Sequence, residues 1–262
     1  MILAHPYHFV LASPWPFTSS IATINFIMTL ALSMHDYIPT SSHLLLITFI
    51  VLVWSIVLWL RDTIIEGSLL GDHTLIVRRG FNYGFNLFVL SEILIFAAIF
   101  WAYLHSAINP LIELGLAWAP MDIAAVNAME LPLINTILLL SSGATILYSH
   151  HKWIKGDHSN ALISMLITTL LVVVFVIFQV VEYSLAQFTI TDGVFGSLFY
   201  AGLGLHGFHM ITLILMLSLV TFRMWTRSFS RTHSTNLDTT VIYSHVLDVI
   251  WLALFVVFYV WV

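Results

Sequence analysis

The sequence predicts an all-α integral membrane protein with seven transmembrane helices, and three observations support this fold class. Hydrophobic residues make up 60% of the 262 residues and charged residues only 8%, whereas soluble domains carry about 25% charged residues. Seven apolar stretches approach or exceed the roughly 20 residues that a spanning helix needs. All eight Lys and Arg residues fall within 61–79, 152–155 and 223–231. Seven crossings therefore place every fixed positive charge on one side of the bilayer.

The first three helices are expected at residues 15–34, 43–60 and 80–105. The second should stop where Arg61 and Asp62 interrupt the apolar run. The third should end before Asn109 and Pro110, because proline lacks an N–H and disfavours helix at the preceding residue. The loop that follows carries three acidic residues and no basic one, which predicts that it lies opposite the positive charges: Glu113, Asp122 and Glu130.

The other four helices are expected at residues 131–150, 161–185, 193–222 and 239–262. Lys152 and Lys155 separate the fourth helix from the fifth, and Asp192 with Gly193 gives a turn or cap signal before the sixth. The longest stretches exceed the hydrocarbon thickness, so we expect them to tilt. Residues 1–262 are thus read as a single polytopic membrane domain, with the N-terminus and the basic loops on one face and the C-terminus on the other.

Glu92 is the sharpest candidate for a functional residue, because it lies about midway along the third expected helix. A carboxylate at that depth in a bilayer is costly and indicates function by default. Burial disfavours its charged form, so we expect this carboxyl to be neutral at pH 7 and to have a proton-related role. The alternative is a neutral carboxyl that only hydrogen-bonds to a neighbouring helix.

The histidines raise the question of a haem or metal site. His206 and His209 are three residues apart and share a helix face, as do His245 and Asp248. A metal site needs several converging ligands, and a bis-histidine haem needs two ligands that face each other at similar depth. The spacings show no such repeated pair. We therefore expect no metal site and no cofactor in this chain, and histidines that bond to backbone or lipid.

Arginines at the ends of apolar runs suggest contacts with phospholipid. Arg61 follows Trp59 closely, and Arg223 directly follows the sixth apolar stretch. An arginine beside an aromatic residue at headgroup level suits a lipid phosphate. Glu66 and His73 lie in the loop after Arg61 and could add headgroup contacts. The alternative for all of these residues is that they only orient the chain in the membrane.

Several function classes lack their signatures in this chain. There are no cysteines, which excludes disulfides, thiolate metal sites and cysteine nucleophiles. We find no phosphate-cradling loop, catalytic triad or zinc spacing, and we expect neither catalytic residues nor a nucleic-acid partner. Small residues at 141–144 and 200–204 predict close helix packing, and Glu182 and Asp248 are expected to hydrogen-bond between helices.

Several longer strings then identify a family. They run in order along nearly the whole chain: 13–16 (SPWP), 61–62 (RD), 71–74 (GDHT), 88–106 (FVLSEILIFAAIFWAYLHS), 113–115 (ELG), 130–151 (ELPLINTILLLSSGATILYSHH), 188–209 and 243–252 (YSHVLDVIWL). On these residues the chain resembles subunit III of the mitochondrial haem–copper cytochrome c oxidases.

The resemblance implies a fold and a set of site residues. The fold is a bundle of two helices and a bundle of five, separated by a V-shaped cleft that holds phospholipids. Glu92 matches the family's buried glutamate. Five residues match positions near the lipid site, and Arg61 joins them on the argument above: Trp59, Glu66, His73, His209 and Arg223.

The resemblance also implies an activity and partners. The chain would be a core, non-redox subunit of an enzyme complex that transfers electrons from cytochrome c to oxygen and pumps protons. It would support assembly, stability and proton uptake. Subunit I would be its main contact, with subunit II, accessory subunits and phospholipids, while haem a and copper reside in the partner subunits. The location would be the mitochondrial inner membrane, with the N-terminus and basic loops in the matrix and the C-terminus in the intermembrane space.

The chain departs from the family pattern in four places. The usual Trp-Pro-Pro reads WAP at 118–120, and the usual His-His-x-Gly-Phe-Glu reads HSTNLD at 233–238. The usual Trp-Trp-Gly end reads VWV at 260–262, and an arginine often found before Glu66 is Ile65 here. These changes affect loop and terminal contacts with partners, and the last one weakens one expected headgroup contact.

Two other classes of function remain open on residue chemistry alone. A secondary transporter could use Glu92 for proton coupling, but it should have broken helices and polar groups that converge at the midplane. A membrane b-type cytochrome would need paired axial histidines. The resemblance favours the oxidase subunit over both.

Overall fold

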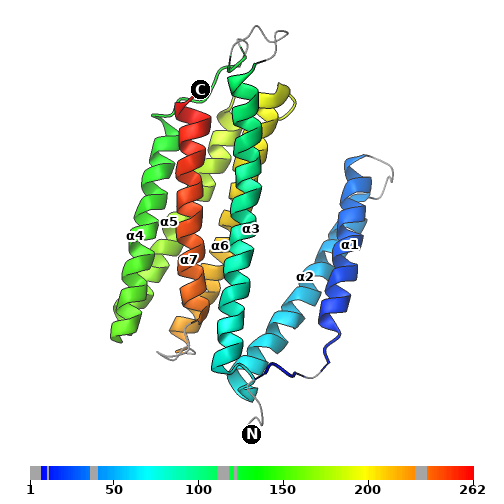
Figure 1. Ribbon diagram of the computed structural model, residues 1–262, viewed down its shortest axis with the longest axis vertical. Helices are drawn as coiled ribbons and strands as arrows, with labels where there is room; N and C mark the ends of the chain where they lie inside the picture. The colour runs from blue at the N-terminus through cyan, green and yellow to red at the C-terminus, as the bar shows by residue number, and fades with distance from the viewer. Residues whose placement is uncertain (1–6, 11, 36–40, 111–117, 121–122, 228–234) are drawn as a thin grey trace. The chain divides into compact units, whose positions relative to one another are not determined.

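The computed structural model describes residues 7–10, 12–35, 41–110, 118–120, 123–227 and 235–262, and all regular secondary structure within these ranges is helical (Figure 1). Within these described ranges, seven helices are long and apolar enough to cross a membrane, which confirms the predicted fold class. Seven residues used above lie outside the described residues: Glu113, Leu114, Gly115, Asp122, Arg231, His233 and Ser234.

The chain divides into two compact units, Met1–Phe81 and Asn82–Val262. Helices α1 and α2 belong to the first unit, and most of α3 belongs to the second with α4 to α7. This division agrees with a grouping of two helices and five. The single-domain interpretation and the cleft between the groups stay predictions.

The first unit is an antiparallel pair of helices followed by a tight turn. It contains α1 (Trp15–Met34), α2 (Ser41–Ile65), the π-helical turn η1 (Glu66–Leu70) and the start of α3 (Leu75–Ile108). Thr29 and Thr48 join α1 to α2 through hydroxyl oxygens 2.9 Å apart. Gly71 ends η1 in the left-handed conformation, with φ +75°, which suits a residue without a Cβ.

The helix α2 runs further than the sequence indicated. It continues past Arg61 and Asp62 to Ile65, although we expected it to stop at these charges. Charges at a helix end can stay helical because long side chains reach the water layer. Helix α3 also starts five residues earlier than expected, and it ends at Ile108, just before the Asn109-Pro110 step.

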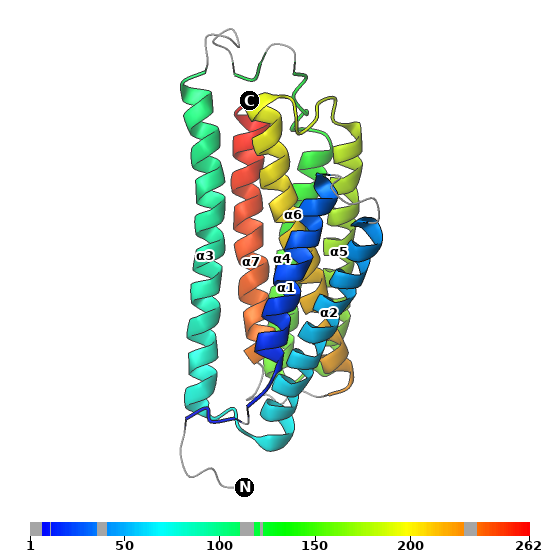
Figure 2. The same ribbon diagram turned by 90° about the vertical axis from the view of Figure 1, so that its right-hand side faces the viewer.

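The second unit packs four helices together and adds α3 on α6 and α7 (Figures 1 and 2). Its other elements are α4 (Leu131–Lys155), α5 (His158–Leu185), α6 (Gly193–Trp225), α7 (Thr235–Phe255) and the π-helical turn η3 (Val256–Val260). Gly156, with φ +84°, ends α4. Asp157 then caps α5 by accepting the backbone N–H of Asn160 at 3.4 Å.

Two kinds of helix contact hold the second unit together. Hydroxyl groups link α4 to α5: Ser149 Oγ donates to the carbonyl oxygen of Ala161 at 2.7 Å, and Ser164 Oγ donates to that of Thr145 at 2.8 Å. Aromatic rings link α3 to its neighbours instead. The ring of Tyr103 lies 4.6 Å from that of Phe258, centroid to centroid.

The described basic residues of the second unit gather at one end. Lys152 and Lys155 close α4, and Arg223 and Arg227 lie at the end of α6. These two helix ends lie at the same end of the unit (Figure 1). The arrangement is the one that the charge pattern predicted for a chain with all its positive loops on one side.

Candidate functional site

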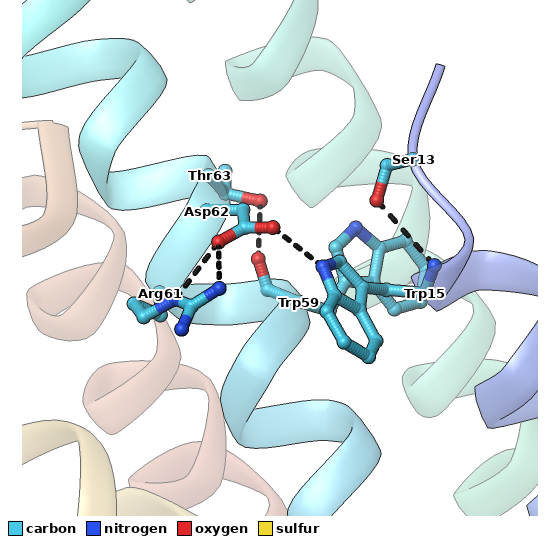
Figure 3. Close-up of polar contacts among 6 residues, drawn as sticks. All are labelled: Ser13, Trp15, Trp59, Arg61, Asp62 and Thr63. Atoms are coloured by element: carbon cyan, nitrogen blue, oxygen red, sulfur yellow. Dashed lines mark hydrogen bonds and ion pairs between the residues drawn. The ribbon is translucent and has the colours of Figure 1, made fainter. Parts of the chain in front are cut away.

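The first group of candidate residues surrounds Asp62 at the end of α2. The indole N–H of Trp15 donates to one carboxylate oxygen of Asp62 at 2.5 Å (Figure 3). The guanidinium of Arg61 contacts the other oxygen through Nε at 2.9 Å and a terminal nitrogen at 2.7 Å. Asp62 therefore joins α1 to α2 and fixes one edge of Arg61, a contact that sequence reasoning missed.

Arg61 keeps much of its surface free despite this ion pair, because 56% of its side chain is exposed. Trp59 lies two residues earlier in α2 and is also 42% exposed. Its backbone carbonyl accepts the Thr63 hydroxyl at 3.0 Å (Figure 3). An exposed arginine and an exposed indole thus lie within one turn of each other at the end of a membrane-spanning helix, where headgroups are expected.

Glu66 and His73 form a second group, and it includes a residue that sequence analysis did not select. His8 Nε2 lies 3.9 Å from Glu66 Oε2, and one ligand atom from each of His8, Glu66 and His73 lies within 4.8 Å of the others. Burial lowers the pKa of His73, and the charge of His8 lowers it further, against smaller opposing effects of Glu66 and Asp72.

Glu92 lies midway along α3, as expected, and pairs with His209 of α6. Its Oε2 is 2.7 Å from His209 Nε2, with side chains 16% and 7% exposed. Sequence reasoning placed both residues but missed their pairing. The carboxyl and the imidazole lie within hydrogen-bond distance of each other. Pairing thus reduces the cost of placing Glu92 in the bilayer.

The remaining candidates do not all join these groups. His209 is buried with Glu92 in the second unit, so its Nε2 faces a carboxylate. Arg223 lies half-buried in the last turn of α6. The structure places Trp59, Arg61, Glu66 and His73 in the first unit, and His209 and Arg223 in the second.

Other histidines and acids make contacts within the protein. His206 Nε2 lies 3.4 Å from the carbonyl oxygen of Leu247. His150 pairs with Asp238 of α7 at 3.0 Å, a contact that the sequence did not reveal. Glu182 accepts a hydrogen bond from the Tyr259 hydroxyl, which confirms its expected bond between helices.

Comparison with known proteins gives one consistent result. The family model for cytochrome c oxidase subunit III matches residues 5–262. Cytochrome c oxidase subunit 3 of Wickerhamomyces canadensis is 54% identical over 256 residues, covering 98% of this chain and 95% of the relative. The subunit 3 proteins of Saccharomyces cerevisiae and Yarrowia lipolytica are 52% and 47% identical, each over 98% of this chain and 95% and 96% of the relative.

Proposed function

Because the chain belongs to the cytochrome c oxidase subunit III family, and is a non-redox, multi-pass subunit of that oxidase complex, we propose that it supports the complex by binding phospholipid. Bound lipid would stabilise the assembled enzyme and sustain its activity. The proposed headgroup residues are Trp59, Arg61, Glu66, His73 and Arg223. His209 was expected among them, but its contact with Glu92 suggests a different role.

The exposed guanidinium of Arg61, at the same end of α2 as the exposed Trp59, carries this proposal. Asp62 holds one edge of the Arg61 guanidinium, which orients the side chain. Since more than half of the side chain stays exposed, its remaining N–H groups can donate to a lipid phosphate. Trp59 supplies the amphipathic ring that favours the same depth in the membrane.

Measuring the phospholipid retained by the purified complex tests the proposal. Arg61→Gln should weaken lipid retention by about tenfold, since a hydrogen bond to a charged group contributes about 1.5–3 kcal/mol. Arg79→Gln is the matched control, because it removes the same charge from an exposed position in the same unit. Native mass spectrometry counts the lipids after detergent washing. If both variants kept the wild-type number, lipid binding by Arg61 would be refuted.

A second role is favoured by the contact between Glu92 and His209. A carboxyl and an imidazole whose atoms lie 2.7 Å apart can pass a proton between them, and such a pair inside the membrane would support proton uptake by the complex. Glu92→Gln should slow proton uptake. Glu182→Gln, which alters another buried carboxyl that is bonded to Tyr259, should leave it unchanged. Equal rates in both variants would make the Glu92 pair purely structural.

The proposal includes a location and partners. The positive loops indicate that the N-terminus and the basic ends face the matrix and the C-terminus faces the intermembrane space of a mitochondrial inner membrane. Subunit I is the proposed main contact, with subunit II and accessory subunits beside it. Haem a and copper are assigned to those partners, and cytochrome c is the substrate of the whole complex.

A further inference from the structure

We propose that His8, Glu66 and His73 form a binding site for a divalent metal ion of the zinc class in the first unit. The site reverses the expectation of no metal ion in this chain. It takes Glu66 and His73 from the headgroup residues proposed above, so that lipid binding would rest on Trp59, Arg61 and Arg223. Zinc binds imidazole nitrogen and carboxylate oxygen, and it has no redox chemistry. It is therefore compatible with a non-redox subunit.

Three separate segments bring the ligands together. His8 comes from the stretch before α1, Glu66 begins the π-helical turn η1, and His73 lies between η1 and α3. The Phe81 ring packs against both imidazoles, with centroids 5.7 Å from His8 and 5.0 Å from His73. The two imidazoles also lie edge to face, 5.6 Å apart. This packing limits the rotation of both rings.

The spacing of the ligand atoms suits a tetrahedral ion after a small closure. Ligands about 2.0–2.2 Å from zinc lie roughly 3.3–3.5 Å from one another. His8 Nε2 and Glu66 Oε2 are 3.9 Å apart, and all three ligand atoms lie within 4.8 Å. The required contraction is small, and His8 can supply it because its side chain is 36% exposed. The fourth position would be left to water.

The position of His73 indicates that its ring is placed for a ligand. Its Nε2 is buried and has no hydrogen-bond partner among the described residues, and such a nitrogen is costly to leave unpaired. The ring fits closely over Gly67, where an added Cβ would lie 2.5 Å from His73 Nδ1. Because Gly67 has no side chain, the turn has room for the imidazole of His73. A metal ion would satisfy the buried nitrogen.

Binding of Zn²⁺ alone to the intact oxidase complex tests this site. Equilibrium dialysis against radioactive Zn²⁺ should find one more bound ion in the wild type than in His8→Ala, Glu66→Gln or His73→Ala, or at least about tenfold weaker binding of that ion. His43→Ala removes an exposed imidazole at the other end of α2 and should bind as the wild type does. Excess Mg²⁺ should not displace the ion, because Mg²⁺ prefers oxygen ligands.

The variants separate this proposal from lipid binding. Arg61→Gln should lose phospholipid but keep the zinc, so either proposal can fail alone. His8→Ala changes an exposed side chain outside the helices, and an unchanged haem content per complex would show that the complex still assembles. If any of the three ligand variants kept the wild-type amount of zinc under these conditions, the three-ligand site would be wrong.

Discussion

The contact between α4 and α5 and the contact of α3 with α6 and α7 hold helices together in opposite ways. Between α4 and α5, hydroxyls reach the backbone of the other helix, as Ser149 does to Ala161. Around α3 the contacts are aromatic rings, such as Phe96 against His209 at 5.6 Å. Small residues let backbones approach, whereas rings keep them apart.

The difference between these two helix contacts shows where a membrane protein can place a carboxyl beside an imidazole. Lipid gives little hydrophobic drive for helix association, so packing and hydrogen bonds must supply it. The α3 contact is spaced by rings, and it contains Glu92 and His209. The two contacts should therefore respond differently to substitution. A smaller side chain should destabilise the aromatic contact of α3, and a larger side chain should destabilise the contact between α4 and α5.

Removing a ring from the α3 contact should have the largest effect. Phe96 is 1% exposed, and truncation of a buried phenylalanine costs about 3–5 kcal/mol. We expect Phe96→Ala to lower the free energy of unfolding by that amount, and Phe96→Leu to lower it by clearly less. Titration with a denaturing detergent in mixed micelles measures both. Equal losses would show that ring volume does not hold α3 in place.

Adding volume to the α4–α5 contact should have an intermediate effect. Ser149 is fully buried, and overpacking costs about 1–3 kcal/mol. We therefore expect Ser149→Leu to destabilise the protein by about that much. Ser149→Ala removes only the hydroxyl bond, and such bonds average about 0.6 kcal/mol in membranes. The same titration measures the free energy of unfolding of both variants. If Ser149→Ala lowered it as much as Ser149→Leu, added volume would not explain the effect.

The turn between α4 and α5 should give the smallest and most pH-dependent effect. Hydrogen bonds from Asn160 and then Lys152 hold the pKa of Asp157 below its usual value. Since the folded-state pKa is lowered, this stabilisation is present above the unfolded value of about 3.9 and is lost as the pH falls through the folded value. Asp157→Asn keeps a capping side chain and removes the charge.

The wild type should therefore be slightly more stable than Asp157→Asn at pH 7, and the difference should disappear in acid. Unfolding measured in detergent from neutral to acidic pH follows this difference. A difference that stayed constant across the range would assign the effect to capping geometry rather than to charge.

The sequence predicted the features that depend on residues close to one another along the chain. Composition and charge position predicted seven spanning helices on the described chain, and depth along α3 predicted that Glu92 would be unusual. Helix ends were less accurate. Helix α2 passes Arg61 and then widens into a π-helical turn at Glu66–Leu70, because interfacial charges and local hydrogen bonding leave little trace in hydropathy.

The partners of the candidate residues could not be predicted in the same way. Helical spacing placed His209 and His206 on one face, but it does not say which helix that face meets. Glu92 and His209 are more than a hundred positions apart in the chain, and only packing brings them together. His8 was missed for a similar reason, since it lies before the first helix and meets Glu66 and His73 through the fold.

The two bonds that join α1 to α2 have a consequence for biosynthesis. One bond lies near each end of the pair: Thr29 with Thr48, and Trp15 with Asp62. All four residues belong to the first quarter of the chain, so this helical hairpin needs nothing made later. The two helices can pair in the bilayer while the ribosome is still translating α3. The rest of the chain then enters the membrane after a hairpin that is already folded and inserted.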